Sequence, residues 1–477
     1  MLGNCFINID SDMSAYEQIA HNIGKQIRDG RLVYGEKLPS QRDLCSIFGV
    51  SRPTIIKALE ILESENIIKI EDKKRAVVCS DPYNEDKNKV NWKQYTCAAY
   101  SHSLPCSYRA VSYLRSNPNV INLYECTFGK DFFPDKPLRE VMKYVGEDMH
   151  KIIHHSSLDI RGTLSLRQVI CDHLTQKDIY VKPSQVLICN NLQNAFKTIF
   201  DSICNPHINF FIENESIFLF DQSAPETLNF QPIKMDREGM IPEEVEHYLR
   251  IRKKGILMLD TDYGMPTGIT YSMKRRKKII DISAAYNLPI IESNVVSDCW
   301  HTTPPLPTLK SMDLNNNIIY VFSLARPFMS MPMTAIVVAE QLMPSLLNVK
   351  LMNDEYTDVI PQIVMEKLLS KGIYTSYMDE IRPMIIERCA KVDELLKKYF
   401  TGIAQWEKPD RGVNCRLNFG HNMKHCFKKL LKDNILLYPP EIFGSDNNFI
   451  WFCYTGVSIE KLDFSLSKMA YYIKNNT

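Results

Sequence analysis

The sequence predicts an α/β protein in two parts: a small N-terminal helix-turn-helix with a wing, and a large domain built on a mostly parallel sheet. Three observations support this. The chain has 477 residues, too many for one ordinary domain. Between residues 40 and 62, a glycine-containing turn separates two short amphipathic segments. From about residue 120 onward, short apolar segments alternate with helical ones, which indicates parallel strands buried on both faces.

The segment 10–80 is predicted to contain three helices and a hairpin. In the first helix, Ile19, Ile23 and Ile27 recur at a spacing that puts them on one helical face. This face is expected to pack against the two helices that follow.

The second helix is predicted to begin after Ser40. Serine is a favourable N-cap, and Asp43 three residues later suits the positive end of the helix dipole. Leu44, Ile47 and Phe48 are expected to form its buried stripe.

A turn then leads into the third helix. Gly49 suits the left-handed conformation that ends a helix, Ser51 is expected to cap the next one, and Pro53 fits its first turn. The predicted inward-facing residues are Ile55, Leu59 and Leu62. Two short strands, IIKIE and AVVCS, follow and are expected to form a wing.

This segment resembles the GntR family of winged helix-turn-helix regulators. The matching runs are YEQI at 16–19, GEKLPSQRDL at 35–44 and GVSRPT at 49–54, all in one register. The resemblance implies that the third helix enters the major groove of DNA by its N-terminal end. The wing departs from the family's glycine-rich tip, which favours simple attraction to phosphates there. The candidate DNA-binding residues are Ser40, Arg42, Ser51, Arg52, Thr54, Lys57, Lys73, Lys74 and Arg75.

Net charge does not by itself predict a DNA-binding protein. The chain carries a net charge of +1, and residues 1–80 hold eleven basic and eleven acidic side chains. The prediction of DNA binding therefore depends on where the basic residues lie, not on their sum.

Residues 81–115 are polar, have no sustained period and are predicted to be a linker. Residues 116–477 form the predicted large domain, in which 375–477 is a smaller C-terminal α/β lobe. The predicted strands are 185–190, 208–213, 255–260, 289–293 and 317–322, and the predicted helices include 192–202, 273–286 and 361–400.

The large domain resembles the aminotransferases of pyridoxal phosphate fold type I. The best anchor is the run PTGIT at 266–270, and weaker matches include Arg161-Gly162, Leu166-Arg167 and the run PLPTLK at 305–310. With the GntR segment in front, the chain resembles the MocR subgroup of GntR regulators. The resemblance implies a pyridoxal-phosphate-dependent-transferase-like fold and a homodimer.

The positions at which this family carries its chemistry do not match. By alignment, the Asp that pairs with the pyridinium nitrogen is Ser293, the ring-contacting Tyr is Val295, and the Schiff-base lysine is Leu324. The arginine that binds the substrate carboxylate falls on Trp451. The phosphate-binding turn is Asn190-Asn191-Leu192-Gln193. The predicted degenerate cofactor pocket consists of Asn190, Asn191, Gln193, Ser293, Val295, Ser323, Leu324 and Trp451.

We therefore expect no catalytic residues, no transamination and no covalent cofactor. Non-covalent binding of pyridoxal phosphate through neutral side chains is left open, and so is a wholly structural pocket or one for an apolar effector. Two other hypotheses remain. One is a regulator that uses pyridoxal phosphate through another residue, with Lys310 the nearest lysine upstream; the less favoured one is an active aminotransferase.

The expected partners are a double-stranded DNA operator, a second copy of the chain and a small-molecule effector. The 14 cysteines are scattered without a CxxC pair, which favours reduced thiols in the cytoplasm. No run of 18 apolar residues occurs, so no membrane span is expected.

His421 and His425 have a spacing that can bind a metal, but no further ligand is near, and no metal site is predicted. The basic run 274–278 is expected to be a solvated helix face rather than a DNA contact.

Overall fold

The structure is a computed structural model of the chain, and it divides into two compact units, Met1–Tyr108 and Arg109–Thr477. Each unit is described by itself. The predicted linker, 81–115, lies outside the described residues. The structure describes residues 14–28, 32, 35–65, 67–71, 75–79, 117–126, 128–147, 159–203, 205, 207–216, 228–251, 254–295, 299–323, 333–354, 356–408, 412–438 and 448–475.

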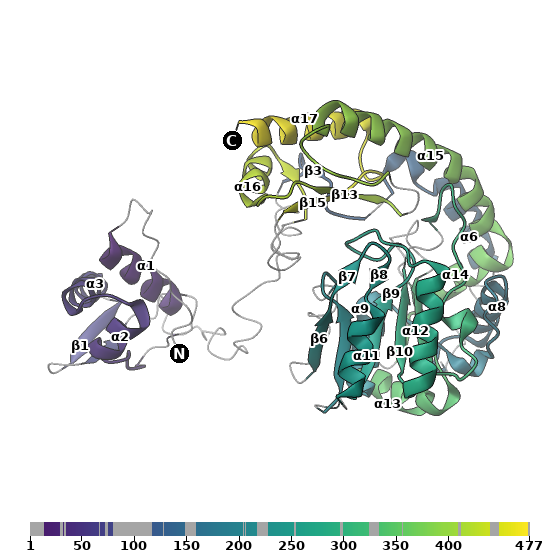
Figure 1. Cartoon of the computed structure of the whole chain (residues 1–477), viewed down its shortest axis with the longest axis horizontal. Helices are drawn as coiled ribbons and strands as arrows, with labels where there is room; N and C mark the ends of the chain where they lie inside the picture. Colours follow the sequence, from purple (N-terminus) through teal and green to yellow (C-terminus); the bar gives the residue numbers. More distant parts are fainter. Residues whose placement is uncertain are drawn as a thin grey trace. The chain divides into compact units, whose positions relative to one another are not determined.

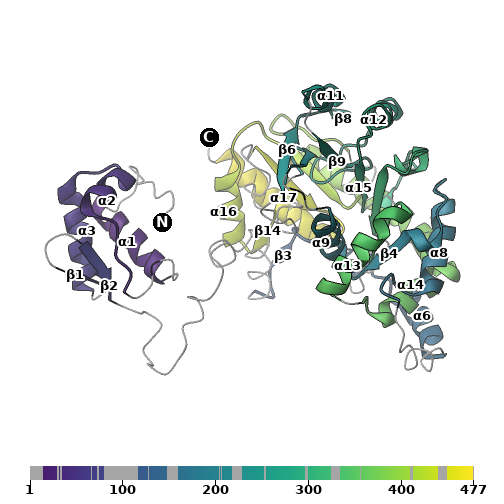
Figure 2. The same cartoon turned by 90° about the horizontal axis from the view of Figure 1, so that it is seen from below.

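The first unit has the three predicted helices, α1 (Ala15–Arg28), α2 (Gln41–Phe48) and α3 (Arg52–Ser64) (Figure 2). The predicted core residues of α1 and α3 are buried and pack in one cluster. The prediction for α2 was wrong at one position: Leu44 and Phe48 are buried, whereas the side chain of Ile47 is 40% exposed. The core covers only the i, i+4 face of this short helix, and Ile47 lies to one side of it.

The turn between α2 and α3 follows the local signals in the sequence. The Ser40 hydroxyl accepts a hydrogen bond from the Asp43 backbone N–H, and the Asp43 carboxylate accepts one from the Ser40 N–H, a reciprocal capping box. Gly49 ends α2 in the left-handed conformation at φ 65°. Ser51 is the N-cap residue of α3, but its hydroxyl pairs with the Thr54 hydroxyl instead of capping the backbone.

The wing is a two-stranded antiparallel sheet of β1 (Ile68–Glu71) and β2 (Arg75–Val78). Ile68 and Val78 face each other across it and are buried in the core of the unit. Lys73 and Lys74, at the predicted tip, lie outside the described residues.

The second unit is built on a seven-stranded sheet of order β4-β12-β11-β10-β9-β5-β6, in which β12 alone is antiparallel to its neighbours. The five predicted strands are all present and are nearly continuous apolar runs, because helices cover both faces of the sheet. The strands are β4 (Val186–Cys189), β5 (Asn209–Glu213), β6 (Asn229–Ile233), β9 (Gly255–Asp260), β10 (Ile290–Asn294), β11 (Ile318–Ser323) and β12 (Thr334–Val337).

Different helices cover the two faces of this sheet. On one face, α9 (Leu192–Ser202) and α13 (Met343–Asn353) pack over the central strands. On the other face, α11 (Pro242–Arg250) and α12 (Met273–Tyr286) lie side by side over the β9–β10 region (Figure 1). The rest of that face is covered by α6 (Asp135–Glu147), α8 (Leu164–Thr175), α14 (Val359–Ser370) and α15 (Ile373–Phe400).

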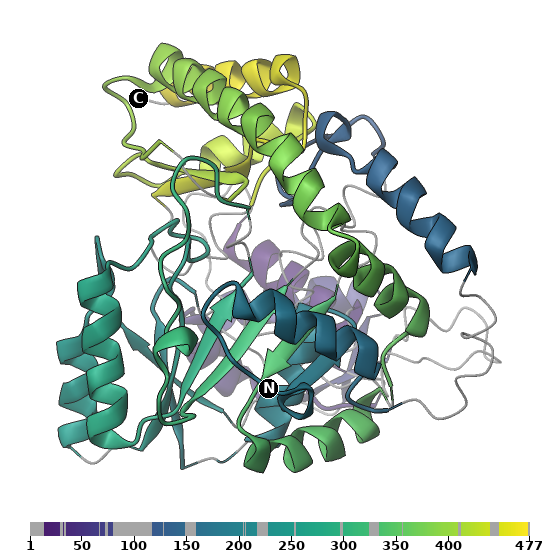
Figure 3. The same ribbon diagram turned by 90° about the vertical axis from the view of Figure 1, so that its right-hand side faces the viewer.

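The C-terminal lobe is joined to the large sheet by the long helix α15, which runs from one to the other (Figure 3). The single helix predicted at 361–400 is two, because Gly372 adopts a left-handed conformation at φ 68° and separates α14 from α15. The lobe also takes in a segment from the start of the unit, since β3 (Ile121–Asn122) pairs with β14 (Ile435–Leu436). Its other elements are β13 (Asn414–Asn418), β15 (Phe449–Cys453), α16 (Lys424–Lys432) and α17 (Ile459–Lys474). Among the described residues, no helix has the length and apolar character needed to cross a membrane.

Acidic side chains gather where the parallel strands end. Glu213 closes β5 and is fully buried, with hydrogen bonds from the hydroxyls of Tyr271 and Ser216. Burial raises the pKa of Glu213 to about 7, and the two hydroxyl donors oppose that rise only in part. Its carboxyl group is therefore protonated in much of the folded protein at neutral pH.

We expect Glu213→Gln to make the second unit more stable than the wild type at pH 8. Between the ordinary pKa of 4.5 and the folded value of about 7, the folded state binds more protons than the unfolded state. Wild-type stability therefore falls as pH rises through 7, by about 3 kcal/mol at most. The amide that replaces the carboxyl group does not ionise and keeps the same shape. Thermal unfolding midpoints of both proteins from pH 5 to 8 measure the effect, and parallel pH profiles would contradict it.

Candidate functional site

The exposed face of α3 is basic at its beginning and acidic towards its end. Arg52 and Lys57 are exposed, Thr54 is half-buried, and Glu60 is the next exposed charge along the helix. The positive end of the helix dipole lies at the same end as the two basic residues. The N-terminal half of α3 thus presents the only basic part of this helix to an anionic partner such as DNA.

Contacts within the first unit hold these basic side chains in place. The Arg52 Nε donates to Gln41 Oε1 at 3.1 Å, which ties the first turn of α3 to the first turn of α2. Arg42 is the exposed neighbour of Gln41 on α2. The ammonium of Lys57 lies 5.4 Å from the centre of the Tyr16 ring on α1. The structure therefore brings the predicted residues of α2 and α3 onto one surface.

The remaining residues predicted to contact DNA lie in different surroundings. Ser40 and Ser51 are engaged in the hydrogen bonds of the turn region, and Arg75 is exposed at the start of β2.

The basic run of 274–278 in the second unit is not a free basic face. Arg276 is buried and donates to three carbonyl oxygens, and Arg275 donates to the Met240 carbonyl and pairs with Asp236. The expectation of a solvated face was therefore wrong for these two residues.

The predicted pocket positions of the second unit gather at one edge of the large sheet. Asn190 follows β4, Ser293 lies near the end of β10 and Ser323 ends β11, and these strands run in the same direction. Asn191 is the N-cap of α9, where its side chain accepts a hydrogen bond from the Asn194 N–H at 2.9 Å. The Asn190 side chain accepts one from the Asp358 N–H. Leu324 lies outside the described residues.

An apolar cluster is formed by residues that follow three of the strands of the sheet. Tyr263 and Val295 are buried against each other, and Leu192, the first residue of α9, packs on them. The Tyr263 hydroxyl donates to the Asn414 carbonyl of the C-terminal lobe. Gly412 is required for this fit, because a Cβ there would lie 2.2 Å from the Tyr263 ring. Val295 was identified from the sequence, but Tyr263 was not, because only the fold brings it to this position.

Trp451 lies in β15, in the separate sheet of the C-terminal lobe. It is buried, and its ring centre is 4.5 Å from that of Tyr438. Directly across the ladder from it is Arg416 on β13, which the sequence reasoning missed. The Arg416 guanidinium pairs with the Glu215 carboxylate at 2.8 Å, so an arginine of this lobe already holds a carboxylate from the protein.

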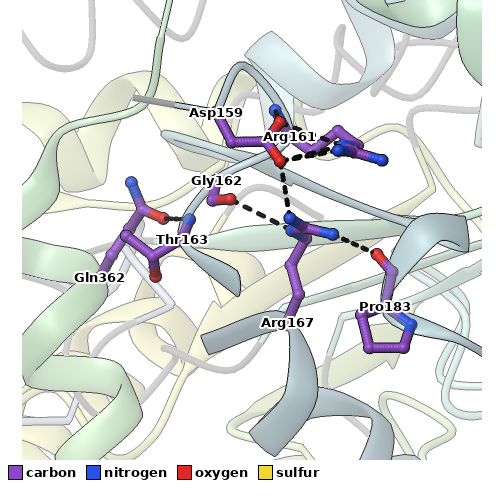
Figure 4. A network of polar contacts seen from close by, with 7 residues as sticks. All are labelled: Asp159, Arg161, Gly162, Thr163, Arg167, Pro183 and Gln362. Atoms are coloured by element: carbon purple, nitrogen blue, oxygen red, sulfur yellow. Dashed lines mark hydrogen bonds and ion pairs between the residues drawn. The ribbon is translucent and has the colours of Figure 1, made fainter. Parts of the chain in front are cut away.

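A polar network supports the start of β4 (Figure 4). Arg167 donates to the Asp159 carboxylate at 2.7 Å and to the carbonyls of Gly162 and Pro183. Burial alone would raise the pKa of Asp159, but the hydrogen bonds and charges of Arg161 and Arg167 outweigh it and hold the pKa below its usual range. The network fixes the turn whose Arg161 carbonyl accepts from Ile188 N–H, and thereby fixes β4 and the asparagines that follow it.

Lys310, the nearest lysine upstream of the position aligned with the Schiff-base lysine, is turned with its ammonium towards the start of β11. Its ammonium donates to Asp313 at 2.9 Å and to the carbonyl of Ile318, the first residue of β11. Ser323 is five residues further along that strand, or about 16 Å away at the usual rise per residue. Lys310 is therefore buried in a structural ion pair, with its ammonium at the opposite end of β11 from Ser323.

The two units are similar to different kinds of known protein. Residues 15–78 match the family described as bacterial regulatory proteins, gntR family. Over its full length the chain is similar to the HTH-type transcriptional regulator YdfD of Bacillus subtilis, with 27% identity over 96% of each chain. It is also similar to the HTH-type transcriptional regulator NorG of Staphylococcus aureus, with 23% identity over 92% of this chain and 99% of that one.

The second unit has the fold of solved aminotransferases. An archaeal alanine:glyoxylate aminotransferase superimposes with a TM-score of 0.74 at 19% identity, over 81% of this chain and all of the other. A kynurenine aminotransferase of Pyrococcus horikoshii gives 0.73 at 19% identity, over 81% and 98%. With a GntR domain at the N-terminus, full-length similarity to HTH-type regulators and an aminotransferase fold, the chain fits a GntR-family regulator of the MocR type.

Proposed function

We propose that this protein is a sequence-specific DNA-binding transcription regulator that reads its operator with the N-terminal half of α3. The observation that carries the proposal is the surface formed by Arg42, Arg52 and Lys57 over the first turns of α2 and α3. Helix-turn-helix proteins place this end of the second helix against base edges, with phosphate contacts from the preceding helix. The relatives named as HTH-type transcriptional regulators support the same function.

The aminotransferase-like unit acts in this proposal without transamination, as a pseudoenzyme. The donor set does not fit covalently bound pyridoxal phosphate: Ser293 lacks the charge that would pair with a pyridinium nitrogen, and Leu324 has no amine for an imine. By alignment, Val295 stands at the ring-contacting position and Leu192 in the phosphate-binding turn, and both pack with Tyr263 in an apolar cluster. The proposal therefore assigns the unit to dimerisation and to sensing a ligand.

Exposed apolar side chains on α13 and at the start of α14 support dimerisation. Leu351, Met352, Tyr356 and Ile360 lie within ten residues of one another and are all about half exposed or more. Such a group on a surface is typical of a protein–protein interface. A symmetric dimer would give each operator two winged helices, one for each half-site.

We expect Arg52→Ala and Lys57→Ala to weaken operator binding by about fivefold or more each, because each removes a contact with a base or a phosphate worth roughly 1–3 kcal/mol. The operator is first selected from a pool of random DNA duplexes with the full-length protein, and affinity is then measured by gel shift at several salt concentrations. A phosphate contact also lowers the salt slope by about 1.

Lys25→Ala is the matched control, because Lys25 is an exposed lysine on α1, two turns beyond the residue that contacts Lys57. It is expected to bind within about twofold of the wild type. Unchanged affinity in both α3 variants, with folding intact by circular dichroism, would refute the assignment of α3 as the recognition helix.

We expect the wild type to be a dimer in solution, with twice the 55.2 kDa mass of one chain. Met352→Glu combined with Ile360→Glu is expected to give monomers, since two buried like charges on each side of an interface repel and lose hydration. Light scattering after size-exclusion chromatography measures the mass. A monomeric wild type, or a variant that stays dimeric, would remove the dimerisation role from this surface.

A further inference from the structure

A cavity of about 480 Å³ lies beside the carboxyl end of β10, on the opposite face of the sheet from the candidate cofactor position. Its wall includes Asn294, whereas Ser293 points to the other face, because successive side chains alternate along a strand. The neighbouring strand shows the same alternation. Val321, level with Ser293, packs in the core under α9, and Phe322, level with Asn294, packs in the core under α14 and α15.

Three segments form the walls of this cavity: the end of α8 with His173, the loop 300–308, and the first turns of α15. Tyr374, Met378 and Thr308 are buried residues of its lining, and proline and leucine side chains of the loop add to the apolar surface. A cavity of this size, in which apolar and aromatic side chains lie beside polar ones, is typical of sites for small organic molecules.

Asn294 is a buried polar residue of the lining whose amide makes no hydrogen bond to the described residues. The residue is 2% exposed, and within the described part of the chain neither its amide nitrogen nor its amide oxygen has a hydrogen-bond partner. A buried amide without partners is costly, and such groups in native proteins call for an explanation. A ligand with an adjacent donor and acceptor would satisfy both atoms at once.

The mouth of the cavity carries aromatic surface and no net charge. The Arg382 guanidinium stacks on the Trp300 ring, 3.8 Å from its centre, and also pairs with Asp379 at 2.5 Å. Lys177 and Asp178 are the other charged residues of the lining. Two basic and two acidic side chains cancel, which favours a neutral ligand with a flat ring.

We propose that this cavity binds a neutral aromatic molecule bearing a carboxamide or lactam group. The amide of the ligand pairs with Asn294. The aromatic ring of the ligand packs between the side chains of Trp300 and Tyr374. The site is separate from the cofactor position, and α15, which lines it, continues into the C-terminal lobe. The inference concerns the second unit alone and does not depend on DNA binding.

Two probes test the proposal with the full-length protein: indole-3-carboxamide, and indole, which lacks the amide. Binding is measured by saturation-transfer NMR titration. We expect the wild type to bind indole-3-carboxamide at least tenfold more tightly than indole. Asn294→Leu is expected to abolish that difference while binding of indole is unchanged, and Trp300→Ala to weaken both probes. Tyr180→Ala, which removes an exposed aromatic residue outside the lining, is the control and is expected to match the wild type.

The absence of saturable binding of either probe by the wild type overturns the proposal, and so does binding that Asn294→Leu and Trp300→Ala leave unchanged. Thermal unfolding without ligand provides a second readout. An amide kept for a ligand is a cost to the empty protein, so Asn294→Leu is expected to raise the melting temperature. A fall would assign Asn294 a structural role instead.

Discussion

The buried carboxylate of Glu292 fixes the edge of the large sheet at which everything else in the second unit is arranged. It accepts hydrogen bonds from the Thr261 hydroxyl after β9 and from the backbone N–H groups of Leu309 and Lys310 before β11, each at 2.8 Å. Burial raises the pKa of Glu292, and these donors oppose the rise. A single side chain thus joins β10 to the segments on either side of it. Because it is fixed, the next two residues must point to opposite faces, Ser293 to the cofactor position and Asn294 to the cavity.

The two faces of this edge have different chemistry. On the Ser293 face, Tyr263 is hydrogen-bonded to the C-terminal lobe, and Val295 and Leu192 pack on it. At the position that alignment assigns to the substrate-binding arginine, Trp451 is buried, and Arg416, across the ladder from it, pairs with Glu215. On the Asn294 face, the amide lies beside a cavity and has no hydrogen-bond partner among the residues that the structure describes. The aminotransferase fold is therefore kept, with an apolar cluster on one face of this edge and a ligand-sized space on the other.

The sequence predicted best what local signals control. The capping box at Ser40, the left-handed Gly49 and the apolar runs of the parallel strands all depend on residues within one turn or one strand. It failed where longer-range structure decides. The break at Gly372 was missed because apolar residues continue on both sides of it. The two-residue strand β3 forms only because β14, some 300 residues later, lies beside it.

The candidate site shows the same division. Alignment of the sequence was enough to predict the loss of the family's catalytic and binding residues, because alignment compares residue types position by position. The positions concerned are Ser293, Val295, Leu324 and Trp451. The replacement contacts could not be predicted, since Tyr263 reaches Asn414 and Arg416 reaches Glu215 only across the folded lobes. The same holds for Asn294, whose amide finds no partner in the described part of the chain and which no pattern in the sequence distinguishes from an ordinary buried asparagine.

The most direct test of the central claim, an aminotransferase fold without its cofactor chemistry, is an absorbance titration of the purified protein with pyridoxal phosphate, followed by borohydride treatment and dialysis. We predict only the spectrum of the free aldehyde, complete removal on dialysis and no mass added to the protein. A stable imine band that borohydride converts into a fixed adduct would mean that a lysine of this chain holds the cofactor, and it would contradict the account.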